Sequence, residues 1–203
     1  MQVALIGASG KAGSRVLDEL LRRGHRVTAI ARNADNLAAR SGVTPKRGDA
    51  SQTETLAPLI AGHDAVISAT RFTSTDPRAL LAAVKQAGVP RLLVVGGAGS
   101  LVTASGAQVV DAPDFPGTHK PEALAGREFL KLLHGEPALD WTFLSPSVAF
   151  APGARTGKFR LGRDDLLVDA SGASAISMED YAIALVDELE TPRHARQRFT
   201  VGY

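Results

Sequence analysis

The order of the first 32 residues constrains the fold more than any other feature of the chain. The apolar run Val3–Ile6 is followed by a glycine turn, Gly7-Ala8-Ser9-Gly10-Lys11-Ala12-Gly13. A stretch with helical spacing then extends to Arg23, and a second apolar run, 27–31, ends at Arg32. This order predicts a strand, a turn, a helix and a second strand, which is how a parallel sheet with a crossover helix begins.

Each glycine of the turn has a physical task in such a unit. Gly7 would turn the chain sharply, Gly10 would let the backbone approach a pyrophosphate, and Gly13 would let the helix pack closely on the strand. The unpaired N–H groups and the dipole at the helix N-terminus favour an anion there. We therefore expect Gly7, Ser9, Gly10, Lys11 and Gly13 to bind the phosphates of a dinucleotide, with a tight turn that binds nothing as the alternative.

Apolar runs alternate with amphipathic stretches through about residue 145, a pattern typical of an α/β fold with a parallel sheet. The predicted strands are 2–6, 26–31, 43–47, 64–68, 91–95 and 140–145. The predicted helices are 11–23, 33–39, 53–61, 76–87 and 119–134. Right-handed crossovers would place the strands in the doubly wound, Rossmann-like order 3-2-1-4-5-6.

Beyond Pro146 the apolar runs become shorter and are broken by glycines. They predict strands at 158–161, 166–168 and 198–201, and a helix that begins at Ser177 with a capping-box pattern. We expect residues 1–203 to form a single Rossmann domain, to which 146–203 contributes a small C-terminal lobe on the substrate side. Asp164 and Asp165 are expected to form a solvated turn.

Composition excludes several classes of function. The chain has no cysteine, which excludes disulfides, thiolate metal sites and a cysteine nucleophile. Its formal net charge is only +2 and no Lys/Arg cluster is interleaved with aromatic residues, so no nucleic-acid partner is predicted. No apolar stretch is long enough to cross a membrane, and the histidines and carboxylates lack metal-ligand spacing. We expect a cytoplasmic protein with a small-molecule partner.

The end of the second predicted strand indicates which dinucleotide would bind. Ligands of such sheets bind beyond the carboxyl ends of the strands. The segment Ala31-Arg32-Asn33 carries no carboxylate that would accept hydrogen bonds from a ribose 2′-hydroxyl. Arg32 can instead hold a 2′-phosphate through a bidentate, charge-assisted contact. This predicts NADP, with NAD possible; an exposed arginine at the start of a helix is the alternative.

The third and fourth strands end on small and polar residues. Asp49 would accept a hydrogen bond from the adenine amino group and Ala50 would pack on the ring, although Asp49 can equally cap a helix. Ala69 and Thr70 would leave room for the ribose and pyrophosphate. Arg71 would reach a phosphate or an acidic substrate, or lie on the surface.

The candidate catalytic residues follow the fifth predicted strand. A second glycine turn includes Gly97 at the cofactor edge, and Ser100 in this turn would donate a hydrogen bond to a reacting atom or serve only as a turn serine. His119, at the start of the helix before the sixth strand, would be a general acid or an exposed residue. Ser145 and Pro146 would orient the nicotinamide carboxamide.

The chain resembles the atypical short-chain dehydrogenase/reductases, in particular the small NAD(P)H-binding proteins provisionally named NADH-flavin reductases, and more distantly the biliverdin reductase B group. The resemblance rests on Gly7-x-x-Gly10-x-x-Gly13, Arg32, Gly48-Asp49, Gly97-Ala98-Gly99-Ser100-Leu101, Asp140-Trp141-Thr142 with Ser145-Pro146, Gly153-x-Arg155-Thr156-Gly157 and Ile176-Ser177-x-Glu179-Asp180-Tyr181-Ala182. It implies an NAD(P)H-binding Rossmann domain and an oxidoreductase.

The sequence departs from the wider superfamily at the proton donor. Typical members use a tyrosine and a lysine four residues later. Here Tyr181 and Tyr203 both lie in the C-terminal lobe, and the helix that should carry the pair starts with His119-Lys120. A flavin accepts hydride with little proton donation from the protein, so the sequence favours an NADPH-dependent reductase of a flavin-like or other conjugated acceptor. The alternatives are an NADP(H)-sensing regulatory protein without turnover and, third, an enzyme similar to nucleotide-sugar epimerases.

Overall fold

An eight-stranded sheet forms the centre of the molecule, in a computed structural model that describes residues 1–37 and 40–203. Its strand order is β3-β2-β1-β4-β5-β6-β10-β8, and only the β8 pairing is antiparallel. The parallel strands are β1 (Gln2–Ile6), β2 (Arg26–Ala31), β3 (Val43–Arg47), β4 (Ala65–Ser68), β5 (Arg91–Val95), β6 (Asp140–Pro146) and β10 (Gln197–Gly202), and β8 spans Arg160–Gly162. The predicted Rossmann-like order 3-2-1-4-5-6 is confirmed, and two further strands extend it.

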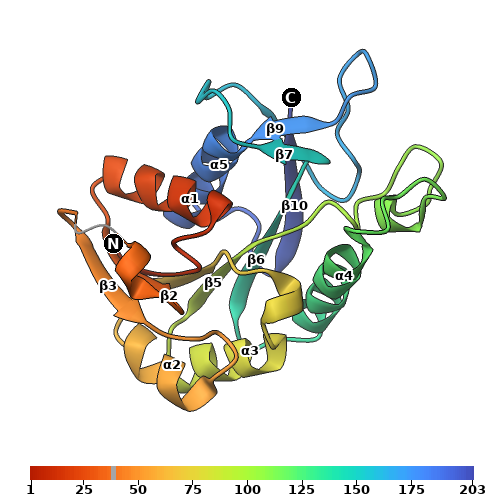
Figure 1. Ribbon diagram of the computed structural model, residues 1–203. Helices are drawn as coiled ribbons and strands as arrows, with labels where there is room; N and C mark the ends of the chain where they lie inside the picture. Colours follow the sequence, from red (N-terminus) through yellow and green to blue (C-terminus); the bar gives the residue numbers. More distant parts are fainter. Residues whose placement is uncertain (38–39) are drawn as a thin grey trace.

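Helices cover both faces of the sheet. One face packs against α1 (Lys11–Arg22) and α5 (Met178–Glu190), and the other against α2 (Thr53–Ile60), α3 (Pro77–Gln86) and α4 (Lys120–His134) (Figure 1). Side chains alternate between the two faces, so that in β1 Leu5 enters one core and Ile6 the other. Because both faces are buried, the central strands are mostly apolar, and their polar residues, Gln2, Ser68 and Arg91, lie at strand ends.

Local signals define the helix ends. The buried positions of α1 include Gly13, Val16 and Leu20, which recur at the spacing of one helix face. Helix α3 begins at Pro77 after Asp76, whose side chain accepts hydrogen bonds from the backbone N–H groups of the first turn. Gly88 follows its end with a φ of +67°, as a left-handed C′ glycine does. No helix in the described parts of the chain combines the length and apolarity needed to span a membrane.

The helix predicted at 33–39 is wrong for the residues that the structure describes. Only a short 3₁₀ turn, η1 (Ala34–Asn36), forms there, and residues 38 and 39 lie outside the described residues. The Asn33 side chain accepts a hydrogen bond from the backbone N–H of Asp35 at 3.1 Å. Such local bonds compete with helix formation, and Leu37 is already extended, with φ −95° and ψ 105°.

The C-terminal lobe differs most from its prediction. A separate parallel pair, β7 (Ala149–Ala151) and β9 (Ala175–Ser177), was not predicted, because three residues are too few for a periodic pattern. The strand predicted at 158–161 is β8, which begins two residues later and ends one residue later than predicted. The strand predicted at 166–168 does not form. The backbone N–H of Leu166 donates instead to Val102 O at 2.8 Å, which ties this segment to the loop after β5.

Candidate cofactor site

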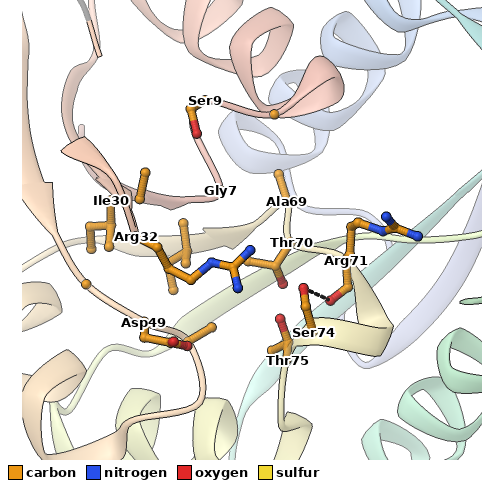
Figure 2. Close-up of a pocket in the computed structure, with 15 residues that line it drawn as sticks. Gly7, Ser9, Ile30, Arg32, Asp49, Ala69, Thr70, Arg71, Ser74 and Thr75 are labelled. Carbon is orange, nitrogen blue, oxygen red and sulfur yellow. Dashed lines mark hydrogen bonds between the residues drawn. The ribbon is translucent and has the colours of Figure 1, made fainter. Parts of the chain in front are cut away.

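A cleft of about 240 Å³ lies at the carboxyl ends of β1, β2, β3 and β4, and we call it the glycine-turn cleft (Figure 2). Its lining consists of Ile6, Gly7, Ser9, Gly10, Ile30, Ala31, Arg32, Gly48, Asp49, Ala50, Ala69, Thr70, Arg71, Ser74 and Thr75. Among them are these residues predicted to bind a cofactor: Gly7, Ser9, Gly10, Arg32, Asp49, Ala50, Ala69 and Thr70. The structure therefore brings the ends of four strands and the first glycine turn together around one space.

Backbone contacts explain the glycines of the turn. Gly7 has a φ of +83°, and a Cβ there would lie 2.6 Å from Ala69 O. At Gly13 a Cβ would lie 2.1 Å from Gly7 O, well inside van der Waals contact. The sharp turn at Gly7 and the close approach of helix α1 to the turn at Gly13 are thus both observed. Gly10 is less crowded, since a Cβ there would lie 3.2 Å from Gly7 O.

The N-terminus of α1 is suited to an anion. Its N-cap residue, Gly10, makes no side-chain cap, and no acidic residue lies in the first turn. The N–H groups of the turn and the positive end of the helix dipole can therefore act on a bound anion. Exposed Ser9 lines the cleft beside them, whereas Lys11 is exposed but does not line it.

Arg32 and Asp49 face the cleft from neighbouring strand ends. Figure 2 shows the exposed Arg32 side chain extended over the cleft, above Asp49 and toward Thr70. Asp49 Oδ1 accepts a hydrogen bond from the backbone N–H of Ser51 at 2.9 Å. Because the N-cap of α2 is Gln52, Asp49 stabilises the loop before the helix and does not cap it. The helix-capping alternative for Asp49 is therefore not observed.

A glutamate that the sequence did not single out supports the wall of the cleft. The 3₁₀ turn η2 (Phe72–Ser74) follows Arg71, and Glu122 of α4 accepts hydrogen bonds from the backbone N–H of Phe72 at 2.7 Å and of Thr73 at 3.1 Å. The Phe72 ring would lie 2.8 Å from a Cβ placed at Gly126. In sequence Glu122 is an ordinary first-turn acid, because its partners lie about 50 residues earlier.

The second glycine turn lies at the end of β5, outside the lining of the glycine-turn cleft. Ser100 is buried, and its Oγ accepts a hydrogen bond from Arg198 Nη1 at 3.2 Å. Arg198 also donates to Asp164 Oδ1 at 2.7 Å from Nε. The Asp164 side chain is 65% exposed in a bend, in agreement with the predicted solvated turn, and it also serves as the ion-pair partner of Arg198. Gly97 would place a Cβ 3.5 Å from the Phe72 ring.

The remaining predicted residues also lie outside that lining. Ser145 and Pro146 are buried at the end of β6, and within the described residues Ser145 Oγ has no hydrogen-bond partner. His119 is exposed immediately before α4. The structure thus groups most of the phosphate and adenine candidates in one cleft, and leaves Ser100 in the turn after β5 and His119 at the start of α4.

Both tyrosines join elements of the fold. The buried Tyr181 hydroxyl donates to Leu144 O at 2.7 Å and accepts from the backbone N–H of Gly96 at 3.3 Å, which links the ends of β5 and β6. Burial raises the pKa of Tyr181 well above its usual range, although the hydrogen bond from Gly96 acts in the opposite direction. The Tyr203 hydroxyl lies 2.8 Å from Asp180 Oδ2 and contacts Ser177.

The sequence match decides what kind of site this is. Residues 7–192 match the family described as NAD(P)H-binding, which includes the glycine turn, the cleft and most of the C-terminal lobe. The chain belongs to this NAD(P)H-binding family. In the parts of this NAD(P)H-binding protein that the structure describes, no group of three metal-ligating His, Asp or Glu side chains is present.

Similar proteins match this NAD(P)H-binding protein over nearly its whole length. It is 43% identical to YwnB, an uncharacterized protein of Bacillus subtilis, over 99% of this chain and 98% of the relative. A solved structure of a provisionally named epimerase from Bacteroides thetaiotaomicron has 43% identity and a TM-score of 0.94, covering 100% of this chain and 96% of that one. A provisionally named NADH-flavin reductase from Streptococcus pneumoniae has 38% identity and a TM-score of 0.82, covering 100% and 99%.

The two named structures carry different reaction names, a reductase and an epimerase, on the same Rossmann-like fold. Such folds host many chemistries, so the reaction has to be argued from the site. What the family and the neighbouring reductase support together is an NAD(P)H-binding protein of the oxidoreductase type.

Proposed function

We propose that this chain is an NADPH-dependent reductase that transfers a hydride to a flavin or another planar, conjugated acceptor. The observation that carries the proposal is the position of Arg32, extended over the glycine-turn cleft from the end of β2. NAD-specific sites of this fold place a carboxylate near this point to bind the ribose 2′-hydroxyl. A guanidinium there matches the doubly charged 2′-phosphate of NADPH instead.

The residues of the cleft fit a dinucleotide along its length. The backbone of Gly7 and Gly10 and the uncapped N-terminus of α1 would hold the pyrophosphate, with the Ser9 hydroxyl and the Lys11 charge beside it. Asp49 has one carboxylate oxygen bonded to Ser51, which leaves the other to accept from the adenine amino group. Gly13 contributes by holding α1 close to the turn.

Small residues would accommodate the nicotinamide half. Ala69 and Thr70 line the cleft without bulky side chains, and Gly97 widens the neighbouring turn. The main chain at Pro146 would orient the carboxamide. Ser145 Oγ is buried and has no hydrogen-bond partner among the described residues, so it is a polar group that a ligand amide or water would satisfy. When bound, reduced nicotinamide supplies the hydride.

The acceptor would receive help from side chains other than tyrosine. Tyr181 is buried and already bonded to backbone groups, which favours an acceptor that needs little proton donation, as a flavin does. Ser100 would hydrogen-bond a reacting heteroatom. His119, exposed at the start of α4, would be the proton source when one is required.

A titration of the purified chain tests the proposal. NADPH and NADH binding are measured first, and the absorbance of the nicotinamide band is then followed after FMN, FAD or riboflavin is added. We expect tighter binding of NADPH and acceptor-dependent oxidation. Binding of NADPH without oxidation by any acceptor would refute the reductase and favour a regulatory protein that senses NADP(H).

Replacement of Arg32 tests the cofactor assignment directly. Arg32→Ala removes charge-assisted hydrogen bonds of roughly 1.5–3 kcal/mol, so NADPH affinity should fall about 10- to 100-fold while NADH affinity stays unchanged. Arg26→Ala is the matched control, because Arg26 is an exposed arginine at the opposite end of the same strand. An equal effect of Arg32→Ala on both dinucleotides would contradict the 2′-phosphate contact.

A further inference from the structure

Arg198 is a buried arginine of β10 that reaches the second glycine turn. Its side chain is 6% exposed, and its guanidinium donates to Asp164 Oδ1 at 2.7 Å from Nε and to Ser100 Oγ at 3.2 Å from Nη1. Ser100 itself is 5% exposed. A buried charge is costly unless it is paired, so Asp164 offsets the charge and the remaining N–H groups are available to polarise a neutral partner.

The bond from Arg198 determines what the Ser100 hydroxyl can do. A guanidinium has only donors, so Ser100 Oγ is the acceptor and its own hydrogen points elsewhere. Within residues 1–37 and 40–203, no hydrogen bond from the Ser100 hydroxyl to an acceptor is found. A hydroxyl that accepts from a cation is also a stronger donor, because hydrogen bonds in a chain polarise one another.

Backbone hydrogen bonds hold the turn that carries Ser100 on both sides of that residue. The backbone N–H of Leu101 donates to Ala98 O at 2.9 Å, and that of Val110 donates to Gly99 O at 2.9 Å. Val102 N–H donates to Asp164 O at 2.9 Å, so the residue that pairs with Arg198 also fastens the chain just after Ser100. The hydroxyl is therefore held in one place at the carboxyl end of β5, where ligands of this fold bind.

We propose that Arg198 is a positioning residue that orients the Ser100 O–H and strengthens it as a donor to the acceptor heteroatom on which negative charge develops. This inference rests on the proposed reductase function. The acceptor gains two electrons and one hydrogen as a hydride, NADPH becomes NADP⁺, and the proton that completes the reduction comes from solvent water through His119. Ser100 keeps its own proton throughout, so it needs no base.

The test uses two readouts on the full chain. The first is the infrared carbonyl stretch of FMN bound in the presence of NADP⁺, which a hydrogen bond from Ser100 lowers. The second is whether a variant changes kcat, the NADPH dissociation constant, or both. In Ser100→Ala and Arg198→Met we expect the stretch to return toward its value in a bond-free flavin, kcat to fall roughly 10- to 100-fold and the NADPH dissociation constant to change less than about twofold.

Conservative variants keep the test valid if Arg198→Met fails to fold. Arg198→Lys retains the charge but cannot hold Asp164 and Ser100 together in the fork geometry, so it should show the same changes at smaller amplitude. Arg91→Lys is the matched control, since Arg91 is a buried arginine at the amino end of β5 that donates to Glu188. Its stretch and kcat should equal those of the wild type.

The possible failures are distinguishable. A double variant Ser100→Ala/Arg198→Lys that is no worse than Ser100→Ala supports a shared role, because residues that act as a unit are not additive. If FMN binds and is reduced but neither variant shifts its carbonyl stretch, the role of Arg198 is refuted and the reductase stands. If NADPH binds and no flavin binds or reacts, the reductase is refuted together with this inference.

Discussion

The glycine-turn cleft and the C-terminal lobe (residues 146–203) are built by different means. The cleft is shaped by main chain: Gly7 turns with a φ of +83°, and the N-terminus of α1 carries no side-chain cap. The lobe is held by carboxylates instead. Asp180 Oδ1 accepts from the backbone N–H groups of Thr156 and Gly157, both at 2.8 Å, and Glu179 Oε2 accepts from that of Gly153 at 2.7 Å.

This difference suits two kinds of ligand. A backbone cradle binds the phosphates that all dinucleotides share, and it needs only glycines to leave the N–H groups accessible. Segment 152–158 of the lobe is exposed along most of its length, and it is fastened to α1 and α5 by charged side chains such as Arg155, which donates to Glu19. Changing those side chains can therefore alter the lobe without altering the main-chain shape of the cleft.

The largest effect should come from the cleft. Gly13→Ala would place a Cβ 2.1 Å from Gly7 O, and neither backbone can move freely. Alanine is otherwise favoured over glycine inside a helix by about 1 kcal/mol, so a decrease in the free energy of unfolding would have to come from the clash. We expect a loss of more than about 3 kcal/mol in the free energy of unfolding, and loss of NADPH binding, measured by urea denaturation and by titration.

Gly117→Ala is the control for this substitution. A Cβ at Gly117 would meet nothing within 4 Å, and its backbone is not in the left-handed region. Stability and NADPH affinity should both stay close to the wild type. If Gly13→Ala behaved like Gly117→Ala, close packing between α1 and the glycine turn would not be what shapes the cleft.

A smaller effect is expected in the lobe. Asp180→Asn keeps the shape of the side chain but removes the charge that accepts from Thr156, Gly157 and Tyr203. Leaving these donors poorly paired should cost about 1–3 kcal/mol in the free energy of unfolding. The comparison between the regions predicts that flavin reduction falls while the NADPH dissociation constant is unchanged. Equal losses in both would show that the lobe and the cleft are one structural unit.

Asp169→Asn tests whether any loop carboxylate has this effect. Asp169 Oδ1 also accepts several local bonds, from the backbone N–H groups of Ser171 and Ala173, but it lies in an exposed turn. We expect no change in cofactor binding or in flavin reduction and only a small change in melting temperature.

The same contrast explains what the sequence could predict. Strands β1, β2, β4, β5 and β6 follow from largely apolar runs, and the turn at Gly7 follows from glycine spacing, because these signals lie within a few residues of one another. The edge strand β3 is mostly polar and exposed. The cap at Asp76 and the end at Gly88 are equally local. The cleft residues predicted from strand ends are brought together for the same reason, since parallel strands end at one edge of the sheet.

The lobe and the supports of the site could not be predicted in this way. Glu122 bonds η2 across about 50 residues, and Arg198 bonds Ser100 across 98. Ser177 and Asp180 form only half of the expected capping box: Ser177 Oγ accepts from Asp180 N at 3.0 Å, whereas the Asp180 carboxylate binds the segment at Thr156. Side-chain partners at such separations leave no periodic pattern in the sequence.

The smallest effect concerns the link between the two regions. Glu19 of α1 accepts from Arg155 of the lobe at 2.9 Å and from Arg23 at 2.8 Å. Burial acts to raise the pKa of Glu19, but the hydrogen bonds and charges of the two arginines outweigh it and leave the pKa below its usual value. A carboxyl whose folded pKa is depressed stabilises the fold above its unfolded pKa, near 4.3, and that contribution is lost as the pH falls through the folded pKa.

Glu19→Gln should therefore be less stable than the wild type at pH 7. The difference in unfolding free energy between the two proteins should shrink by up to about 1.4 kcal/mol per pH unit below pH ~4, measured by urea denaturation at several pH values. Arg155→Gln, which leaves Arg23 in place, should show part of this effect. A difference that stayed constant down to pH ~3 would mean that the Glu19 charge does not hold the lobe to α1.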